Sequence, residues 1–322
     1  MKTKLILVEG LPGSGKSTTA QFLWIQLHKQ GVPCRWYYEE ESPHPVALFD
    51  RSSAHKTATA MLPDALAKWQ AFVTTAMHAD DISIIESRFW QDTIFPLLLE
   101  DLDRSHILAF IQAITEVCRG LEPVLLYLFQ ADYAHTLRRI CTARGPRIER
   151  LYITWVEQSV FGQRRGLQGF AGLVRFWEAV KEIAEQLFTA LDIPKLAIEN
   201  SAGQWHDYYR QICAFLGLSW CAEPAPAAQY LRRFVGTYTC RHHDTVKVFT
   251  IHMDHGNLVI RDFPWLWPEN RLIPKAHNVF YVASWPFELI FHEDGSGAIH
   301  SMRRETQAGD WRTLDQVFPK IQ

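Results

Sequence analysis

Residues 4–29 read KLILVEGLPGSGKSTTAQFLWIQLHK and decide the first fold prediction. Residues 4–8 form a short apolar run typical of a buried strand, and residues 18–29 place apolar side chains at helical spacing. Between them, residues 10–17 match G-x-x-x-x-G-K-[ST], the phosphate-binding loop (P-loop). Because the loop lies between a strand and a helix, we interpret it as a P-loop rather than as a glycine-rich turn with a stray lysine.

The residue types of the loop explain its chemistry. Backbone N–H groups of a glycine-rich turn can converge on phosphates, and the helix N-terminus adds its positive end. Lys16 can reach the β- and γ-phosphates, and the Ser17 hydroxyl can ligate Mg²⁺. The sequence therefore predicts ATP and Mg²⁺ as cofactors. The residues expected to hold the nucleotide are Gly10, Pro12, Gly13, Ser14, Gly15, Lys16, Ser17 and Thr18.

The composition bears on whether the protein binds nucleic acid, associates with a membrane or contains disulfides. The chain has 322 residues, enough for two domains, and a net charge of −2 gives no support for a nucleic-acid or membrane partner. The sequence contains no run of about 18 apolar residues, so it predicts no membrane span. Six cysteines lie scattered without a C-x-x-C pair, which predicts reduced thiols and a cytoplasmic location.

Short apolar strands alternate with helices as far as residue 217, which predicts a parallel sheet with flanking helices. The further strands are expected at residues 33–41, 82–85, 123–129 and 195–199. Helices are expected, among other places, at about residues 150–161, 170–191 and 205–216. Ligands bind beyond the carboxyl ends of such strands, so the P-loop and the polar groups at 39–41 and 86–88 should share one edge. Residues 218–229, rich in Pro and Ala, predict a linker.

Beyond the linker, the pattern of apolar residues changes from helical spacing to alternation with polar residues. This predicts a small antiparallel β domain at residues 230–322. Its strands are expected at residues 234–240, 245–253, 257–263, 277–283, 287–293 and 298–305. The pattern from Tyr230 to Tyr238 (Y-x-x-x-F-x-G-x-Y) resembles the lipocalin-like β domain appended to some serine hydrolases. The sequence leaves three roles open for it: binding a partner, covering the site of the first domain, or forming a homodimer.

Three stretches of the first domain resemble thymidylate kinases and deoxynucleoside kinases. They are VEGLPGSGKSTTA at 8–20, WQAFVTTAMHADDISIIESR at 69–88, and LRRICTARGPRIE at 137–149. The resemblance covers residues 1 to about 217 and implies an ATP-dependent kinase. It also implies that Gln70 binds a nucleobase, although an exposed helical glutamine is the plainer interpretation.

Carboxylates follow the second and third predicted strands. Glu39 and Glu41 share one strand face, and a carboxylate there can orient an acceptor hydroxyl or take its proton. The resemblance favours Glu39 and keeps Glu41 in reserve; a solvated acidic loop is the alternative. By resemblance, Glu86 assists Mg²⁺ and Arg88 holds phosphate in the acceptor site. The order Glu-Ser-Arg departs from the families' Glu-Arg-Ser and Asp-Arg-Tyr, and a strand-end ion pair is the alternative for Arg88.

An arginine-rich stretch completes the predicted site. Its members are Arg138, Arg139, Arg144, Arg147 and Arg150, interrupted by Gly145 and Pro146 as a closing lid requires. Arg139 and Arg144 rank first as groups that stabilise the transferring phosphoryl group, and a basic solvated helix face is the alternative. Trp36, Tyr37, Trp69, Phe89 and Trp90 form either an aromatic acceptor wall or core.

We therefore predict a kinase that transfers the γ-phosphate of ATP to a small-molecule acceptor, of nucleoside or nucleotide type. One alternative is a P-loop phosphotransferase that acts on an antibiotic or another metabolite. The other is a nucleotide-regulated binding protein whose β domain is the effector.

Overall fold

The computed structural model describes residues 2–48, 57–242, 245–264, 267–306, 308 and 317–321. Its contacts divide the chain into two compact units, each described here by itself. The first holds residues 1–39 and 43–220, and the second holds residues 40–42 and 221–322. No helix among the described residues is long and apolar enough to cross a membrane.

The first unit is built on a five-stranded parallel sheet of order β2-β3-β1-β4-β5. Its strands are β1 (Leu5–Gly10), β2 (Cys34–Tyr37), β3 (Ile82–Glu86), β4 (Val124–Phe129) and β5 (Lys195–Glu199). Residues of β1 and β3 are buried along their whole length, as a sheet covered on both faces requires. The predicted fold class is therefore confirmed for this unit.

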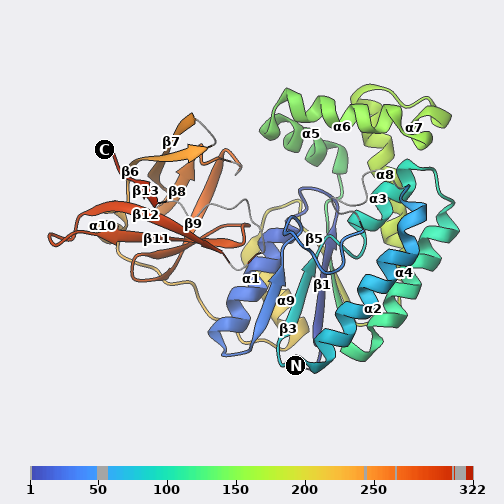
Figure 1. The fold of residues 1–322 in the computed structure, drawn as a ribbon, viewed down its shortest axis with the longest axis horizontal. Helices are drawn as coiled ribbons and strands as arrows, with labels where there is room; N and C mark the ends of the chain where they lie inside the picture. Colours follow the sequence, from blue (N-terminus) through green and yellow to red (C-terminus); the bar gives the residue numbers. More distant parts are fainter. Residues whose placement is uncertain are drawn as a thin grey trace. The chain divides into compact units, whose positions relative to one another are not determined.

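Helices cover both faces of this sheet (Figure 1). The helices of this unit are α1 (Lys16–Lys29), α2 (Leu62–His78), α3 (Gln91–Leu99), α4 (Arg104–Cys118), α5 (Tyr133–Arg144), α6 (Pro146–Gln158), α7 (Val160–Arg165), α8 (Gly169–Ala190) and α9 (Trp205–Leu216), with short 3₁₀ turns at Thr59–Met61 and Arg119–Leu121. Helix α1 packs on β1, β2 and β3, whereas α2, α3, α4 and α8 contribute to the core on the other face.

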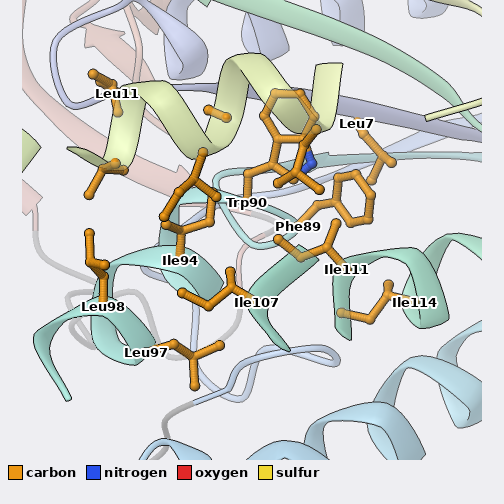
Figure 2. Packing of buried hydrophobic residues seen from close by; sticks show 14 of the residues in the cluster. Leu7, Leu11, Phe89, Trp90, Ile94, Leu97, Leu98, Ile107, Ile111 and Ile114 are labelled. Carbon is orange, nitrogen blue, oxygen red and sulfur yellow. The ribbon is translucent and has the colours of Figure 1, made fainter. Parts of the chain in front are cut away.

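That core explains the aromatic residues near the strand ends. Phe89 and Trp90 lie among leucine and isoleucine side chains of α3 and α4 (Figure 2). Trp69, Phe89 and Trp90 are each at most 1% exposed. Of the two interpretations of these aromatic residues, core packing fits these three.

Two boundaries differ from the predicted ones for physical reasons. The strand expected to continue to residue 41 ends at Tyr37, because the backbone N–H of Glu39 donates to Glu86 Oε1 (3.2 Å) instead of to a neighbouring strand. The helix expected from residue 150 begins at Pro146, where the missing N–H of proline costs no helical hydrogen bond. Gly145 before it has φ 86°, so the helix is interrupted there as predicted.

The second unit is an eight-stranded antiparallel sheet in which every strand pairs with its neighbours in sequence. The strands are β6 (Gly236–His242), β7 (Thr245–Asp254), β8 (Asn257–Arg261), β9 (Glu269–Ala276), β10 (Val279–Val282), β11 (Phe287–Glu293), β12 (Ile299–Thr306) and β13 (Val317–Pro319), preceded by helix α10 (Ala228–Arg232). A bridge between Tyr238 and Lys320 brings the two ends of the order together, so the sheet is nearly closed. This confirms the predicted antiparallel β class.

The interior of this sheet is packed with aromatic rings. Ring centroids lie 4.8 to 6.3 Å apart along a continuous chain of contacts. The rings, each at most 3% exposed, are Phe234, Tyr238, Phe249, Phe263, Phe280, Phe287, Phe291 and Phe318. The Tyr238 hydroxyl donates to the Phe234 carbonyl oxygen (2.7 Å), which explains the spacing of the Y-x-x-x-F-x-G-x-Y pattern.

The sequence missed two of these eight strands. β9 contains Pro274, which cannot donate to a ladder and argues against a strand interior. β13 has three residues, too few for an alternating pattern to be recognised.

We predict that proteases first cleave the native protein within residues 221–227. These residues form no helix or strand, whereas Trp220 before them contacts the Phe22 ring at 5.7 Å and is held to the first unit. Limited proteolysis followed by mass spectrometry should give two fragments that each remain folded. A first cut within residues 1–210, with residues 218–229 protected, would contradict the predicted domain boundary.

Candidate functional site

The P-loop lies between β1 and α1, and its glycines adopt conformations that other residues reach only with strain. Gly13 has φ 77° and Gly15 has φ 88°. A Cβ on Gly13 would lie 2.4 Å from Ile140 Cδ1, and one on Gly15 would lie 2.2 Å from Trp205 Cη2. Side chains of α5 and α9 therefore pack directly on the loop.

The loop is held through its carbonyl groups, three of which bond to side chains from outside the loop. Each of four successive oxygens accepts a side-chain hydrogen bond: Leu11 O from Lys16 Nζ (3.2 Å), Pro12 O from the Tyr133 hydroxyl (3.3 Å), Gly13 O from Gln130 Nε2 (3.5 Å) and Ser14 O from Asn200 Nδ2 (2.6 Å). This set of bonds favours the backbone orientation in which N–H groups converge on an anion. Gln130 also donates to Asn200 Oδ1 (2.6 Å), so Asn200 is itself fixed.

We predict that Asn200→Ala lowers the free energy of unfolding by about 1–3 kcal/mol, because it leaves the buried Ser14 oxygen without this donor. Because the loop is then less well held, we expect the ATP dissociation constant to rise about tenfold. Denaturant titration and calorimetry measure the two effects. Asn270→Ala is the matched control: it removes a buried amide of the second unit and should leave ATP affinity unchanged. Equal ATP affinity in both variants would contradict the prediction.

A cluster of four polar side chains, Lys16, Gln91, Glu39 and Ser87, lies between the P-loop and the end of β2. Lys16 Nζ donates to Gln91 Oε1 (2.7 Å), and Gln91 Nε2 lies 3.5 Å from Glu39 Oε1. The Ser87 hydroxyl donates to the other oxygen of Glu39 (2.7 Å). Ser87 has φ 64°, a strained conformation for a non-glycine residue. The structure thus brings the P-loop lysine, Glu39 and the polar group after β3 to one edge of the sheet.

Glu86 lies beside this cluster and is fully buried. Burial and, to a smaller extent, the Glu39 carboxylate raise its pKa to about 8, although hydrogen bonds from the Glu39 backbone and the Ser17 side chain and the charge of Lys16 act in the opposite direction. Its second oxygen, Oε2, is buried without a hydrogen-bond partner in the described structure. A hydroxyl and a carboxylate oxygen are hard ligands suited to Mg²⁺, so Ser17 and Glu86 fit the group that the P-loop implies.

Arg88 is engaged by protein groups. Its Nη1 lies 2.6 Å from Asp92 Oδ2, and its Nη2 donates to the backbone oxygen of Glu39. This is the ion pair at a strand end that the sequence left open as the alternative for Arg88. Arg88 also helps to position Glu39.

Glu9, near the end of β1, holds the segment after β3 in place through hydrogen bonds to its backbone. Its two carboxylate oxygens accept from the backbone N–H groups of Phe89 (2.9 Å) and Gln91 (3.2 Å). Burial raises the pKa of Glu9 to about 8, and hydrogen bonds from the backbone at residues 89–91 and the charge of Lys16 oppose that shift. Glu9 therefore sets the position of Gln91 between Lys16 and Glu39.

We predict that the free energy of unfolding falls as pH rises from about 4.5 to about 8, and that Glu9→Gln flattens this dependence. The folded pKa of Glu9 lies above its ordinary value of 4.5, so the folded state binds the proton more tightly than the unfolded state. The contribution is complete below pH 4.5 and is lost by pH 8, on the order of a few kcal/mol. Denaturant titrations at several pH values test it. Parallel curves for the two proteins would contradict it.

The arginine-rich stretch occupies α5 and α6, which Figure 1 shows beyond the carboxyl ends of the strands. Arg138 pairs with Glu149 (2.9 Å), and Arg144 donates to the Tyr152 hydroxyl. Arg139 is exposed. Thr136 and Ile140 lie over Gly13. Arg139 follows Thr136 by three residues and Arg144 follows Ile140 by four, so each arginine neighbours one of them on the helix surface. Arg147 and Arg150 are exposed on α6.

Two further candidates are placed differently from the cluster. Gln70 is exposed on α2, and Trp69 beside it provides the buried contact. Glu41 is buried, but the hydrogen bonds to Ser87 and Gln91 are made by Glu39. Glu39 is therefore the carboxylate that the described contacts place next to the P-loop lysine.

Sequence reasoning missed Glu9, Gln91, Asp92 and Asn200. Two of them carried a signal: Glu9 is an acid inside an otherwise apolar strand, and Asn200 is the first residue after β5. The rule that places ligands beyond strand ends applies to Asn200 as well. Gln91 and Asp92 open α3, and nothing in their local sequence distinguishes them from ordinary helix-start residues.

No family model and no curated protein matches the chain. Among solved structures, it is similar to thymidylate kinase from Candida albicans at 15% identity and a TM-score of 0.40, over 67% of this chain and 93% of that one. It is also similar to deoxyadenosine kinase from M. mycoides with bound dATP, at 15% identity and a TM-score of 0.36, over 65% of this chain and 98% of that one. We therefore base the function on this chain's own residues.

Proposed function

We propose that the first unit is an ATP-dependent kinase that transfers the γ-phosphate to a small-molecule acceptor of nucleoside or nucleotide type. The observation that carries the proposal is the chain of hydrogen bonds from Lys16 through Gln91 to Glu39. It joins a group that binds donor phosphates to a carboxylate that can receive an acceptor proton. In-line phosphoryl transfer needs these two groups on opposite sides of the transferred phosphorus.

The roles follow from the chemistry of each group. The P-loop from Gly10 to Thr18 binds the ATP phosphates, and Lys16 stabilises charge on the transferring phosphoryl group. Glu39 orients the acceptor hydroxyl and takes its proton. The Ser87 hydroxyl donates to Glu39 Oε2, which fixes the carboxylate for this role. Arg139 and Arg144 are proposed to add positive charge when α5 and α6 approach the bound nucleotide.

Mg²⁺ bound by Ser17 and Glu86 would neutralise phosphate charge. Glu86 must be ionised to bind it. The raised pKa of Glu86 means that bound Mg²⁺ and a proton compete for this carboxylate.

The test is a screen for acceptor-dependent ADP release, with phosphorylated products identified by mass spectrometry. Nucleosides, nucleoside monophosphates, aminoglycosides and sugars form the panel. A phosphorylated nucleoside or nucleotide supports the proposal, and a phosphorylated antibiotic or sugar supports the alternative acceptor class. ATP hydrolysis that is independent of every acceptor, without any phosphorylated product, overturns the kinase proposal in favour of a nucleotide-regulated binding protein.

A further inference from the structure

Arg88 is the cation next to Glu39, and it is already paired with protein groups. Arg88 Nη1 lies 2.6 Å from Asp92 Oδ2, and Nη2 donates to the Glu39 backbone oxygen. The third nitrogen of the guanidinium, Nε, is buried and has no hydrogen-bond partner in the described structure. The whole side chain is 15% exposed, so this guanidinium is enclosed by protein rather than presented to a ligand.

Arginine recognises a phosphate monoester by offering two parallel N–H groups to its oxygens. Because Nε is buried and each Nη nitrogen already bonds to a protein oxygen, Arg88 can offer two unengaged nitrogens to a phosphate only by releasing Asp92 or the Glu39 carbonyl. Release of Asp92 would leave a carboxylate unpaired beside the incoming dianion, which is unfavourable. The Arg88–Asp92 pair also carries no net positive charge, so it attracts a phosphorylated acceptor weakly.

Arg35, a second cation close to His44, lies with its guanidinium over the Tyr37 ring (4.4 Å to the centroid), and the other described groups around Arg88 add no positive charge on the acceptor side. Glu39 and Glu86 are both carboxyl groups, and Glu86 Oε1 accepts from the backbone N–H of Glu39 (3.2 Å). Burial, together with the charges of Arg88 and Arg35, lowers the pKa of His44 to about 2, so its imidazole is neutral. Lys16 belongs to the loop that binds the donor phosphates. The described surroundings of Glu39 therefore suit a neutral hydroxyl compound.

Resting on the proposed kinase function, we propose that the acceptor is an uncharged hydroxyl compound and that its phosphate monoester is rejected. In the reaction, the acceptor oxygen bonds to the γ-phosphorus of ATP and its proton passes to the Glu39 carboxylate. The bond from that phosphorus to the β–γ bridging oxygen breaks, and ADP leaves with the electron pair. The product is the phosphate monoester of the acceptor, and the site binds that class weakly.

The experiment compares matched acceptor pairs with the whole wild-type protein: each nucleoside with its 5′-monophosphate, and each hexose with its 6-phosphate. Phosphorylated product is quantified by mass spectrometry to give kcat/KM. We expect the hydroxyl member of the productive pair to exceed its phosphate by at least about 100-fold. Equal or higher kcat/KM for the phosphate overturns this inference and leaves the kinase proposal standing. No product from any pair overturns the kinase proposal itself, and this inference with it.

Asp92→Asn tests the role of the ion pair, because it frees Arg88 Nη1 while keeping the side-chain shape. The ratio of kcat/KM for phosphate to that for hydroxyl acceptor should rise at least about tenfold. Asp101→Asn is the matched control, since Asp101 pairs with Arg164 (2.8 Å) and Arg165 (2.6 Å) outside the cluster. It should leave the ratio unchanged. A folded Asp92→Asn protein with the wild-type ratio shows that the pairing of Arg88 does not set acceptor choice, and overturns the inference.

Discussion

The Lys16→Met variant is expected to lose turnover by a factor of about 10²–10³. Its ammonium group is the only described one that hydrogen-bonds both the P-loop, at the Leu11 carbonyl oxygen (3.2 Å), and the acceptor side, at Gln91 (2.7 Å). Methionine keeps most of the buried volume but removes the positive charge that a transferring phosphoryl group needs. The measurements are the ATP dissociation constant by calorimetry and kcat from acceptor-dependent ADP release.

Lys29→Met is the control for this variant, because it removes a lysine from the far end of the same helix. It should retain wild-type kcat and ATP affinity. A Lys16→Met protein that binds ATP normally and turns over normally would show that residues 10–17 are a structural turn and would remove the basis for any kinase assignment.

The parallel sheet could be predicted because its information is local. Strands β1, β3 and β4 are short, mostly apolar runs that are buried along nearly their whole length. Strand β5 and helix α9 begin and end at the predicted residues. Boundaries failed where a tertiary contact replaces a local one, as at Glu39, whose N–H bonds to a side chain from β3. The three-residue strand β13 depends on pairing with β12 and carries too short a pattern of its own.

The candidate site was predictable to the extent that its residues follow strand ends. The P-loop, Glu39 and Glu86 obey that rule and lie together. The contacts that distinguish Glu39 from Glu41 come from Ser87 and Gln91, which are about 50 residues away in sequence, and no local pattern reports such pairing. The pairing of Arg88 with Asp92 likewise depends on how α3 begins.

Glu39→Gln is expected to lower kcat by a factor of about 10²–10⁴ with little change in ATP affinity. The amide keeps the size of the carboxylate, and the backbone N–H that donates to Glu86 is unaffected. It cannot take a proton from an acceptor hydroxyl, and its NH₂ group cannot accept the Ser87 hydrogen bond now made at 2.7 Å. ATP affinity should persist because Lys16 and the loop are untouched.

Glu40→Gln and Glu41→Gln provide the comparison within the same three residues. Glu40 is exposed, and its variant should behave as wild type. If Glu41→Gln loses turnover and Glu39→Gln does not, the catalytic carboxylate is the reserve candidate and the Gln91 connection is structural. If all three variants keep kcat, the carboxylates at the end of β2 take no part in proton transfer, and the acceptor must be activated by another group. Full loss in Glu39→Gln alone, with ATP binding intact, is the result that phosphoryl transfer to a hydroxyl beside Glu39 requires.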